Sequence, residues 1–394
     1  MLNKLRFFFS VESLLPIMLC MMIFNRYSID VGFRMTPIYF LLPFLVIYLI
    51  FWKVKYIKFS LIEFCFIPFY FFCLLSFFYS VDQELSFRFS LGLFLVLTTF
   101  IVVRAVLMNS SQQLSYVLYQ TGIFYVLFSL IWYVFGLLSM NVYMEHHDFY
   151  GVTIEKSIPR MIGVNNDPNI CALIFLFFSF LFYFSKEKFA RLFFYVSFLC
   201  LMLTLSRGGI AAFIAGFFVI FIMGSKFEKL KFIFIGGGAI FLLFVLALLY
   251  PDSYELFIEK RLSGLEEGGG RFQIWANAFS LVDEKPILGY GIFSFRAIME
   301  HHFGIAKFAH NTFVEVVLEL GLLGFILFAL PLLVTFFFCV KLTKINEYKF
   351  LLPAYVSLLV AMNGLSIYIN IIFLFFILII SVATYELKAG VSNG

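Results

Sequence analysis

The sequence predicts an all-α integral membrane protein of about twelve transmembrane helices with both termini in the cytoplasm. Apolar residues make up 63% of the 394 residues and charged residues 13%, and the mean hydropathy is +1.02. A soluble domain is roughly a quarter charged, so this composition indicates a membrane protein. Apolar runs near the ~20 residues that a helix needs to cross a bilayer recur along the chain, and the period-two alternation of a transmembrane barrel is absent.

The expected spans follow these apolar runs in order. They cover residues 6–24, 35–52, 59–79, 89–107, 114–138, 168–185, 189–206, 208–225, 231–250, 312–340, 350–367 and 369–386. Most segments between them are too short for a folded domain, which indicates a single polytopic domain over residues 1–394. All the cysteines fall inside spans, so neither a disulfide framework nor a metal cluster is expected.

Two types of basic residue divide between the two faces of the membrane. Lysine dominates one face, which carries Lys53, Lys55, Lys58, Lys186, Lys188, Arg191, Lys226, Lys229, Lys231, Lys341, Lys344 and Lys349. By the positive-inside rule this face is the cytoplasm. Arginine gathers on the other face, at Arg26, Arg34, Arg88, Arg160, Arg207, Arg261, Arg271 and Arg296. Because guanidinium grips phosphate oxygens with two parallel bonds, this bias indicates a phosphorylated ligand outside, and lipid headgroups or ion pairs with Asp and Glu are the alternative.

Two outer loops are long enough to form a functional site. Residues 139–167 form the first long periplasmic loop, and residues 251–311, between the ninth and tenth spans, form the main, catalytic one. Long loops in a compact bundle are usually functional. Two apolar stripes in the second loop predict helices on the membrane surface, at Tyr254, Phe257, Ile258, Leu262 and Leu265, and at Phe272, Trp275, Phe279 and Val282.

A glycine run opens the second of these surface helices. Gly268, Gly269 and Gly270 directly precede Arg271. Free backbone N–H groups and the positive end of the helix dipole form an anion site at such a helix start, and Arg271 adds a fixed charge, so pyrophosphate would fit. A flexible turn between two interfacial helices is the alternative.

Polar residues then lead into the tenth span. Asn311, Glu315 and Glu319 are spaced four residues apart, so they share one helix face, and carboxylates in a span usually face a bundle interior or an aqueous cavity. His310 precedes them, and a neutral imidazole with an unperturbed pKa near ~6.5 suits a general base. The alternatives are that Asn311 caps the helix, that Glu315 pairs with an arginine, and that His310 is an inert surface residue.

Short motifs stand in a particular order over roughly residues 160–325. They are Arg160-Met161-Ile162-Gly163 with Pro168-Asn169, Ser206-Arg207-Gly208, Gly270-Arg271 with Trp275, Pro286 before Gly289-Tyr290-Gly291, and His310-Asn311 followed by Glu319 and Gly321-Leu322-Leu323-Gly324. His310 and Gly321 are separated by ten residues, which matches a His-x10-Gly pattern. In this order and on the predicted outer face, the set resembles the O-antigen ligase and Wzy-type polysaccharide polymerase superfamily.

The resemblance implies a membrane glycosyltransferase on the periplasmic face of the bacterial inner membrane, without metal or cofactor. Its donor would be a glycan on undecaprenyl pyrophosphate. His310 would deprotonate the acceptor hydroxyl while Arg207 and Arg271 clamp the leaving pyrophosphate, with inversion at the anomeric carbon. The implied substrate-binding residues are Arg160, Gly270, Asn311, Glu315 and Glu319.

Two activities of this superfamily fit the same residues. A polymerase transfers the glycan to a lipid-linked repeat unit, whereas a ligase transfers it to lipid A-core during lipopolysaccharide synthesis. The polymerase is favoured, since its group is the more numerous and divergent and the loop at residues 139–167 suits two similar glycolipids. The implied partners are undecaprenyl-pyrophosphate-linked oligosaccharides, membrane lipids and a chain-length regulator protein, without nucleic acid. A flippase or other transporter and a non-enzymatic scaffold are the alternatives from other classes, but most ionisable residues lie in outer loops and no internal repeat is visible.

Overall fold

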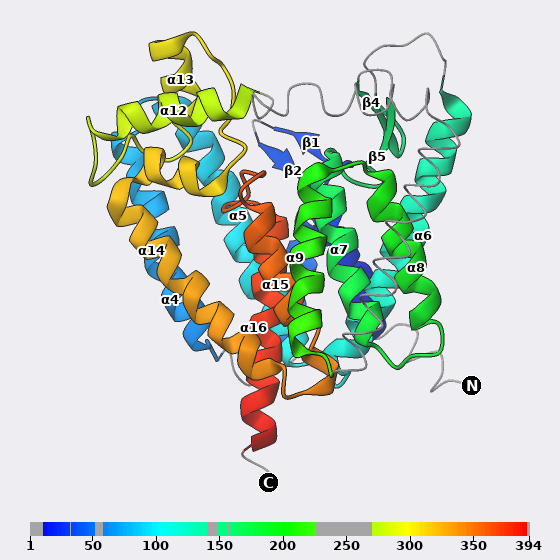
Figure 1. Cartoon of the computed structure of the whole chain (residues 1–394). Coiled ribbons are helices and arrows are strands. Elements are labelled where there is room, and N and C mark those ends of the chain that lie inside the picture. Colours follow the sequence, from blue (N-terminus) through cyan, green and yellow to red (C-terminus); the bar gives the residue numbers. More distant parts are fainter. Residues whose placement is uncertain are drawn as a thin grey trace.

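The computed structural model describes residues 11–391 except for residues 32, 52–57, 141–147, 156–157 and 226–269. These residues form a bundle of apolar helices with short strands and two further helices at one end (Figure 1). The bundle helices are α2 (Val11–Ile23), α3 (Pro37–Phe51), α4 (Leu61–Ser76), α5 (Gln83–Met108), α6 (Leu114–Ser139), α7 (Pro168–Phe184), α8 (Ala190–Leu203), α9 (Arg207–Met223), α14 (Thr312–Leu342), α15 (Leu351–Ala361) and α16 (Ile371–Val391). The prediction of an all-α membrane protein is therefore confirmed.

The predicted spans correspond to these helices one by one, and the span at residues 231–250 lies outside the described residues. Four helical segments are long and apolar enough to cross a bilayer alone, namely Leu61–Tyr79, Gln83–Met108, Leu114–Ser139 and Thr312–Leu342, and shorter apolar helices accompany them. The number of spans and their sidedness stay predictions. Two predicted boundaries differ from the structure by six residues: α5 begins at Gln83 rather than at residue 89, and α15 ends at Ala361 rather than at residue 367.

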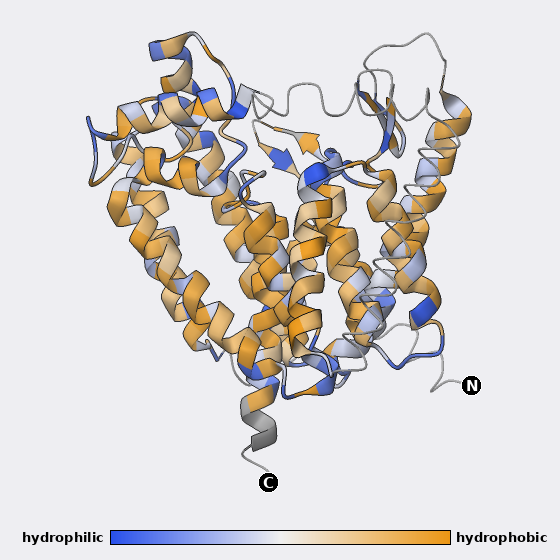
Figure 2. Ribbon diagram, viewed as in Figure 1, coloured by the Kyte–Doolittle hydropathy of each residue, from blue (hydrophilic) through white to orange (hydrophobic). Residues whose placement is uncertain are grey.

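Helices α7 and α16 lie at the centre of the bundle, and nearly all of their side chains are buried. A helix that is apolar on every side can be covered by lipid or by other helices, and here the burial shows that helices cover both, with phenylalanine providing much of the contact. Phe177 of α7 packs edge-on against Phe350, Phe375 and Phe376, with ring centroids 4.9 to 5.5 Å apart. Figure 2 shows the apolar band of the bundle between more polar ends.

The cysteines all lie in helices of this bundle. They are unpaired, and every one except the half-buried Cys65 is buried, as expected for small packing residues.

The polar end of the bundle carries the two long loops. The first forms a three-stranded antiparallel sheet of β3 (Asp148–Phe149), β4 (Val152–Glu155) and β5 (Ile158–Met161). The second contributes α12 (Arg271–Val282) and α13 (Phe295–Phe303). A small hairpin of β1 (Ile29–Asp30) and β2 (Arg34–Met35) lies between them, at the end opposite the C-terminus (Figure 1).

Helix α14 is broken near this end. Gly321 has φ 64° and ψ −168°, a conformation that only glycine adopts without strain. The chain of Pro286 to Gly291 inserts at the break, so closely that a Cβ on Gly321 would lie 2.3 Å from the Ile287 carbonyl oxygen. The motifs around Gly289-Tyr290-Gly291 and Gly321 are therefore two halves of one contact.

Backbone hydrogen bonds replace those that the break removes. The amides of Tyr290 and Gly291 donate to the carbonyls of Leu318 (3.1 Å) and Glu319 (2.7 Å), and the amides of Leu322 and Leu323 donate to Pro286 (2.8 Å) and Ile287 (3.1 Å). Irregular backbone at membrane depth is tolerated only where protein satisfies it in this way. The contact fixes α12 and α13 over the start of α14.

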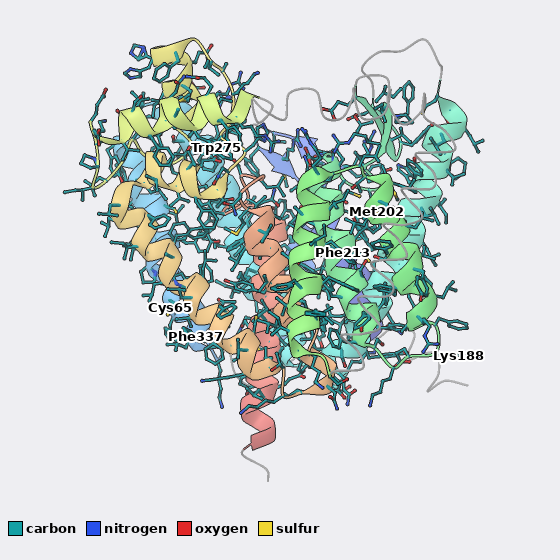
Figure 3. All side chains as sticks on the ribbon, viewed as in Figure 1. Cys65, Lys188, Met202, Phe213, Trp275 and Phe337 are labelled. Carbon is teal, nitrogen blue, oxygen red and sulfur yellow. The ribbon has the colours of Figure 1, made fainter. Side chains whose placement is uncertain are left out.

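The opposite end contains a buried ion pair. Arg104 Nε lies 2.5 Å from Glu63 Oε1, and the two side chains are 1% and 3% exposed. The other Glu63 oxygen accepts from the backbone amide of Ser60 at 2.6 Å, as part of a capping box at the start of α4. In Figure 3 the labelled Lys188 lies near this end and the labelled Trp275 near the other, so the lysine-bearing loop 186–188 and α12 lie at opposite ends of the bundle.

Candidate functional site

Three of the predicted arginines converge on one cavity at the polar end of the bundle. Arg160 comes from β5, Arg207 from the start of α9, and Arg271 from the start of α12. The cavity has a volume of about 160 Å³, and Glu155, Asn169 and Gly364 also line it. Three segments that span more than a hundred residues of the chain thus place three guanidinium groups around one space.

The cavity also lies at the N-terminal ends of three helices. Asn169 is in the first turn of α7, Arg207 is the first residue of α9, and Arg271 is the first residue of α12. Each helix N-terminus carries partial positive charge and amides without a helical partner. Together with the arginines they make the cavity a site for an anion.

Side chains from the cavity wall hold the start of α9 in place. Ser206 is the N-cap, and its hydroxyl accepts from the Gly209 amide at 3.0 Å. The same hydroxyl donates to Asn169 Oδ1 at 2.7 Å, which ties α9 to the first turn of α7. The Ser-Arg-Gly motif therefore places Arg207 by capping its helix.

Arg160 is fixed on two sides. Its Nε donates to the Thr204 carbonyl at 2.9 Å, and its Nη1 pairs with Glu155 across the β4–β5 hairpin. Buried to 7% exposure, the side chain is held rigidly at the edge of the cavity.

Arg271 is half-buried and follows Gly270, whose φ of 79° turns the chain into α12. Its Nη1 donates a long hydrogen bond of 3.5 Å to the Gly364 carbonyl. Burial and then the neighbouring Arg207 lower the pKa of Arg271, while Asp167 and Glu155 raise it. The repulsion between the two arginines indicates that both act on the same space and would gain from an anion between them. Gly268 and Gly269 lie outside the described residues.

His310 lies beside this group rather than on the cavity wall. Its side chain is exposed, and its φ of 47° is the left-handed conformation, which a histidine rarely adopts. Partial loss of hydration, then the positive charge of Arg271, lower the pKa of His310, and Asp167 opposes this shift. Both lowering effects favour the neutral imidazole, which is the form a general base requires.

Two anchors fix the position of His310 relative to Arg271. The indole of Trp275, four residues after Arg271, donates to the Ala309 carbonyl at 2.8 Å. On the other side, the Thr312 amide donates to the Met362 carbonyl at 2.8 Å, and its hydroxyl donates to the Leu365 carbonyl at 2.6 Å. Arg271 itself bonds to Gly364, so the turn after α15 contacts both Arg271 and Thr312, two residues after His310.

The remaining predicted binding residues do not line the cavity, as far as the structure describes it. Asn311 is the N-cap of α14, where its Oδ1 accepts from the Phe313 and Val314 amides at 3.0 and 3.3 Å. The alternative interpretation, that Asn311 caps the helix, therefore accounts for these contacts. Gly270 stays outside the lining and acts through the turn it makes.

Glu315 and Glu319 point into the protein interior. Glu319 Oε1 accepts from the Phe295 amide at 3.0 Å, and Oε2 accepts from the Tyr368 hydroxyl, so this carboxylate ties α13 and the turn before α16 to α14. Glu315 is buried, and one of its oxygens lacks a hydrogen-bond partner. These contacts favour a structural role over substrate contact for Glu319.

Two other outer arginines form ordinary ion pairs with acidic residues, which was the alternative interpretation of the arginine bias. Arg26 lies 3.9 Å from Asp148, and Arg88 pairs with Glu84 one turn away on α5. Arg261 lies outside the described residues. The arginine bias by itself therefore did not identify which of the described arginines share the cavity.

Sequence reasoning missed Glu155, Asn169 and the turn at residues 362–367, which also form the site. Asn169 was noticed only as part of a motif. Gly364 and its neighbours were placed inside a predicted span, although Asn363-Gly364 is a typical turn sequence that marks the end of a helix. Glu155 carried no signal beyond its place in the long loop.

The second apolar stripe also needs correction. The face of α12 that packs into the protein is Ile274, Ala278 and Leu281, whereas Phe272 and Phe279 are exposed. Trp275 and Val282 are partly buried and pack against the same inner cluster, so only half of the predicted stripe faces outward. The first stripe, at residues 254–265, lies outside the described residues.

Comparison with known families identifies one domain. Residues 192–329 match the family model described as O-antigen ligase, a segment that contains Arg207, Arg271 and His310. A search of curated proteins found no match. The resemblance to the O-antigen ligase and polymerase superfamily is confirmed by this segment.

Proposed function

Because residues 192–329 carry an O-antigen ligase family domain, we propose that this protein is a Wzy-type polysaccharide polymerase. In this proposal it transfers a glycan from undecaprenyl pyrophosphate to a lipid-linked repeat unit on the periplasmic face of the inner membrane. The observation that carries the proposal is the cavity that Arg160, Arg207 and Arg271 share at the starts of three helices.

The chemistry requires charge stabilisation on one side of the anomeric carbon. When the bond between that carbon and the phosphate oxygen breaks, the lipid pyrophosphate leaves with the electron pair. Arg207 and Arg271, aided by the helix N-termini, are placed to stabilise this developing charge. Arg160, anchored to Thr204, would hold the second phosphate.

The same chemistry requires a base on the other side. The acceptor hydroxyl forms the new glycosidic bond with the anomeric carbon and passes its proton to His310. A lowered pKa keeps this imidazole neutral at physiological pH, as a base must be. Attack opposite the leaving group would invert the anomeric configuration.

The ligase is the second candidate, because the description of the matched family names that activity. The arginines and His310 serve either acceptor, since the donor and the bond formed are of the same class. The long first loop, with its three-stranded sheet beside the cavity, supports a second glycolipid as acceptor and thereby the polymerase.

The glycan profile of a deletion strain tests the proposal. A polymerase mutant is expected to lose the polymer and retain a single repeat unit on its acceptor. Undecorated lipid core together with accumulated lipid-linked polymer would instead identify a ligase. An unchanged profile would refute both activities.

A further inference from the structure

The cavity contains one carboxylate among its arginines. Glu155 lines it together with Arg160, Arg207 and Arg271, and pairs with Arg160 Nη1. An acid is unexpected at a site that binds an anion, because like charges repel at close range. Its presence calls for a physical reason.

The two partners of this pair differ in how firmly they are held. The Arg160 side chain is 9% exposed, and Nε is fixed by the Thr204 carbonyl at 2.9 Å. The Glu155 side chain is 49% exposed and lies at the end of β4. Glu155 can therefore rotate toward water with a small loss of free energy, whereas Arg160 is held at the edge of the cavity by its bond to Thr204.

The hairpin itself does not depend on this pair. Backbone pairing joins β4 and β5 from Val152–Met161 to Glu155–Ile158. The Gly151 amide donates to the Trp132 carbonyl of α6 at 3.1 Å, and the Ile162 amide donates to Gly151 at 2.9 Å. The fold of this segment is therefore expected to survive neutralisation of Glu155.

A buried guanidinium without an anion is costly, which gives the carboxylate a role in the empty site. We propose that Glu155 is the resident counter-ion of the arginine cavity, and that a phosphoryl group of the incoming donor displaces it from Arg160. Occupation by the donor then exchanges one anion for another at Arg160 Nη1. This inference rests on the proposed function, since it takes a pyrophosphate as the ligand.

The exchange makes Glu155 a competitor of the ligand. Removing its charge should strengthen binding, unlike the removal of a residue that merely shapes the site. A partly exposed ion pair contributes up to about 1 kcal/mol, which corresponds to a change in affinity of about fivefold.

Binding of inorganic pyrophosphate to the full chain in lipid nanodiscs, measured by calorimetry, tests this inference. Glu155→Gln is expected to bind about fivefold tighter than the wild type. The gain should vanish in an Arg160→Gln background, where the carboxylate has no guanidinium to release. Glu84→Gln, which breaks the exposed pair with Arg88 on α5, is the matched control and should not change the affinity.

If the wild type binds pyrophosphate through the arginines but Glu155→Gln binds it equally or more weakly, the counter-ion role is refuted and the proposed function stays intact. A gain that persists without Arg160 would also refute it. Absence of pyrophosphate binding by both proteins would contradict the anion site itself, and with it the proposed function.

Discussion

Replacing Arg271 by lysine keeps the positive charge in the cavity but removes the planar fork that grips two phosphate oxygens. The structure separates the expected cost in stability from the cost in activity. Arg271 makes one long hydrogen bond of 3.5 Å to Gly364 and is only half-buried, so its replacement should lower the free energy of unfolding by about 1 kcal/mol or less. Loss of one fixed donor to a developing oxyanion typically costs about 3 to 4 kcal/mol, or ~10²- to 10³-fold in rate.

The assay is polymer formation in vitro from purified lipid-linked repeat units, at matched amounts of inserted protein. Arg271→Lys and Arg207→Lys should each reduce the rate by ~10²-fold or more. Arg88→Lys is the control, because Arg88 pairs with Glu84 outside the cavity and should retain full activity. Near-normal rates in both cavity variants would remove these arginines from the clamp.

Other expected outcomes concern His310, its anchor and the membrane topology. His310→Ala should reduce the rate by ~10²- to 10⁴-fold, while His301→Ala should have little effect, and equal rates in the two variants would exclude His310 as the base. The pKa of His310 is lowered, so wild-type activity should persist below pH ~6.5 and fall only as the imidazole protonates. Because Arg271 contributes to this lowering, Arg271→Gln should move the acidic limb of the pH–rate profile to higher pH. Trp275→Phe removes the donor to the Ala309 carbonyl and should lower kcat by about tenfold or more with little change in KM, a split that general destabilisation would not produce. Reporter fusions after Lys188 and Lys344 should report the cytoplasm and a fusion near Glu155 the exterior, and the reverse result would place the cavity on the wrong side for lipid-linked repeat units.

The helices were predictable because their signal is local. Apolar runs of membrane length located α4, α5, α6 and α14, and the predicted start of α14 agrees with the structure, where Asn311 is the N-cap. The start of α5 was placed six residues too late, because the polar first turn after the cap Asp82 was read as a loop. The error at α15 has a physical cause. The apolar residues Met362, Leu365 and Ile367 extended the predicted span past the turn signal at Asn363-Gly364. The backbone of this turn is held by Thr312 and Arg271, which come from other segments and leave no local trace in the sequence.

The site was predictable in its residue types and only partly in its geometry. Guanidinium groups beside helix starts could be read at Gly270-Arg271 and Ser206-Arg207, since capping residues and charge stand next to each other in the chain. Which outer arginines share a cavity is a property of the three-dimensional packing. Arg88 belongs to the same set of predicted outer arginines as Arg160, yet it pairs with Glu84 on the surface of α5.

The carboxylates of α14 show how one sequence pattern is compatible with two roles. Their spacing placed Glu315 and Glu319 on one face, and that face is indeed buried. A buried carboxylate needs a donor, which a ligand or the protein can supply. For Glu319, which precedes the break at Gly321 by two residues, the protein supplies the donors, namely the Phe295 amide and the Tyr368 hydroxyl. The broken helix and its acidic residue therefore work together to hold α12 and α13, and with them Arg271 and Trp275, at a fixed place beside His310.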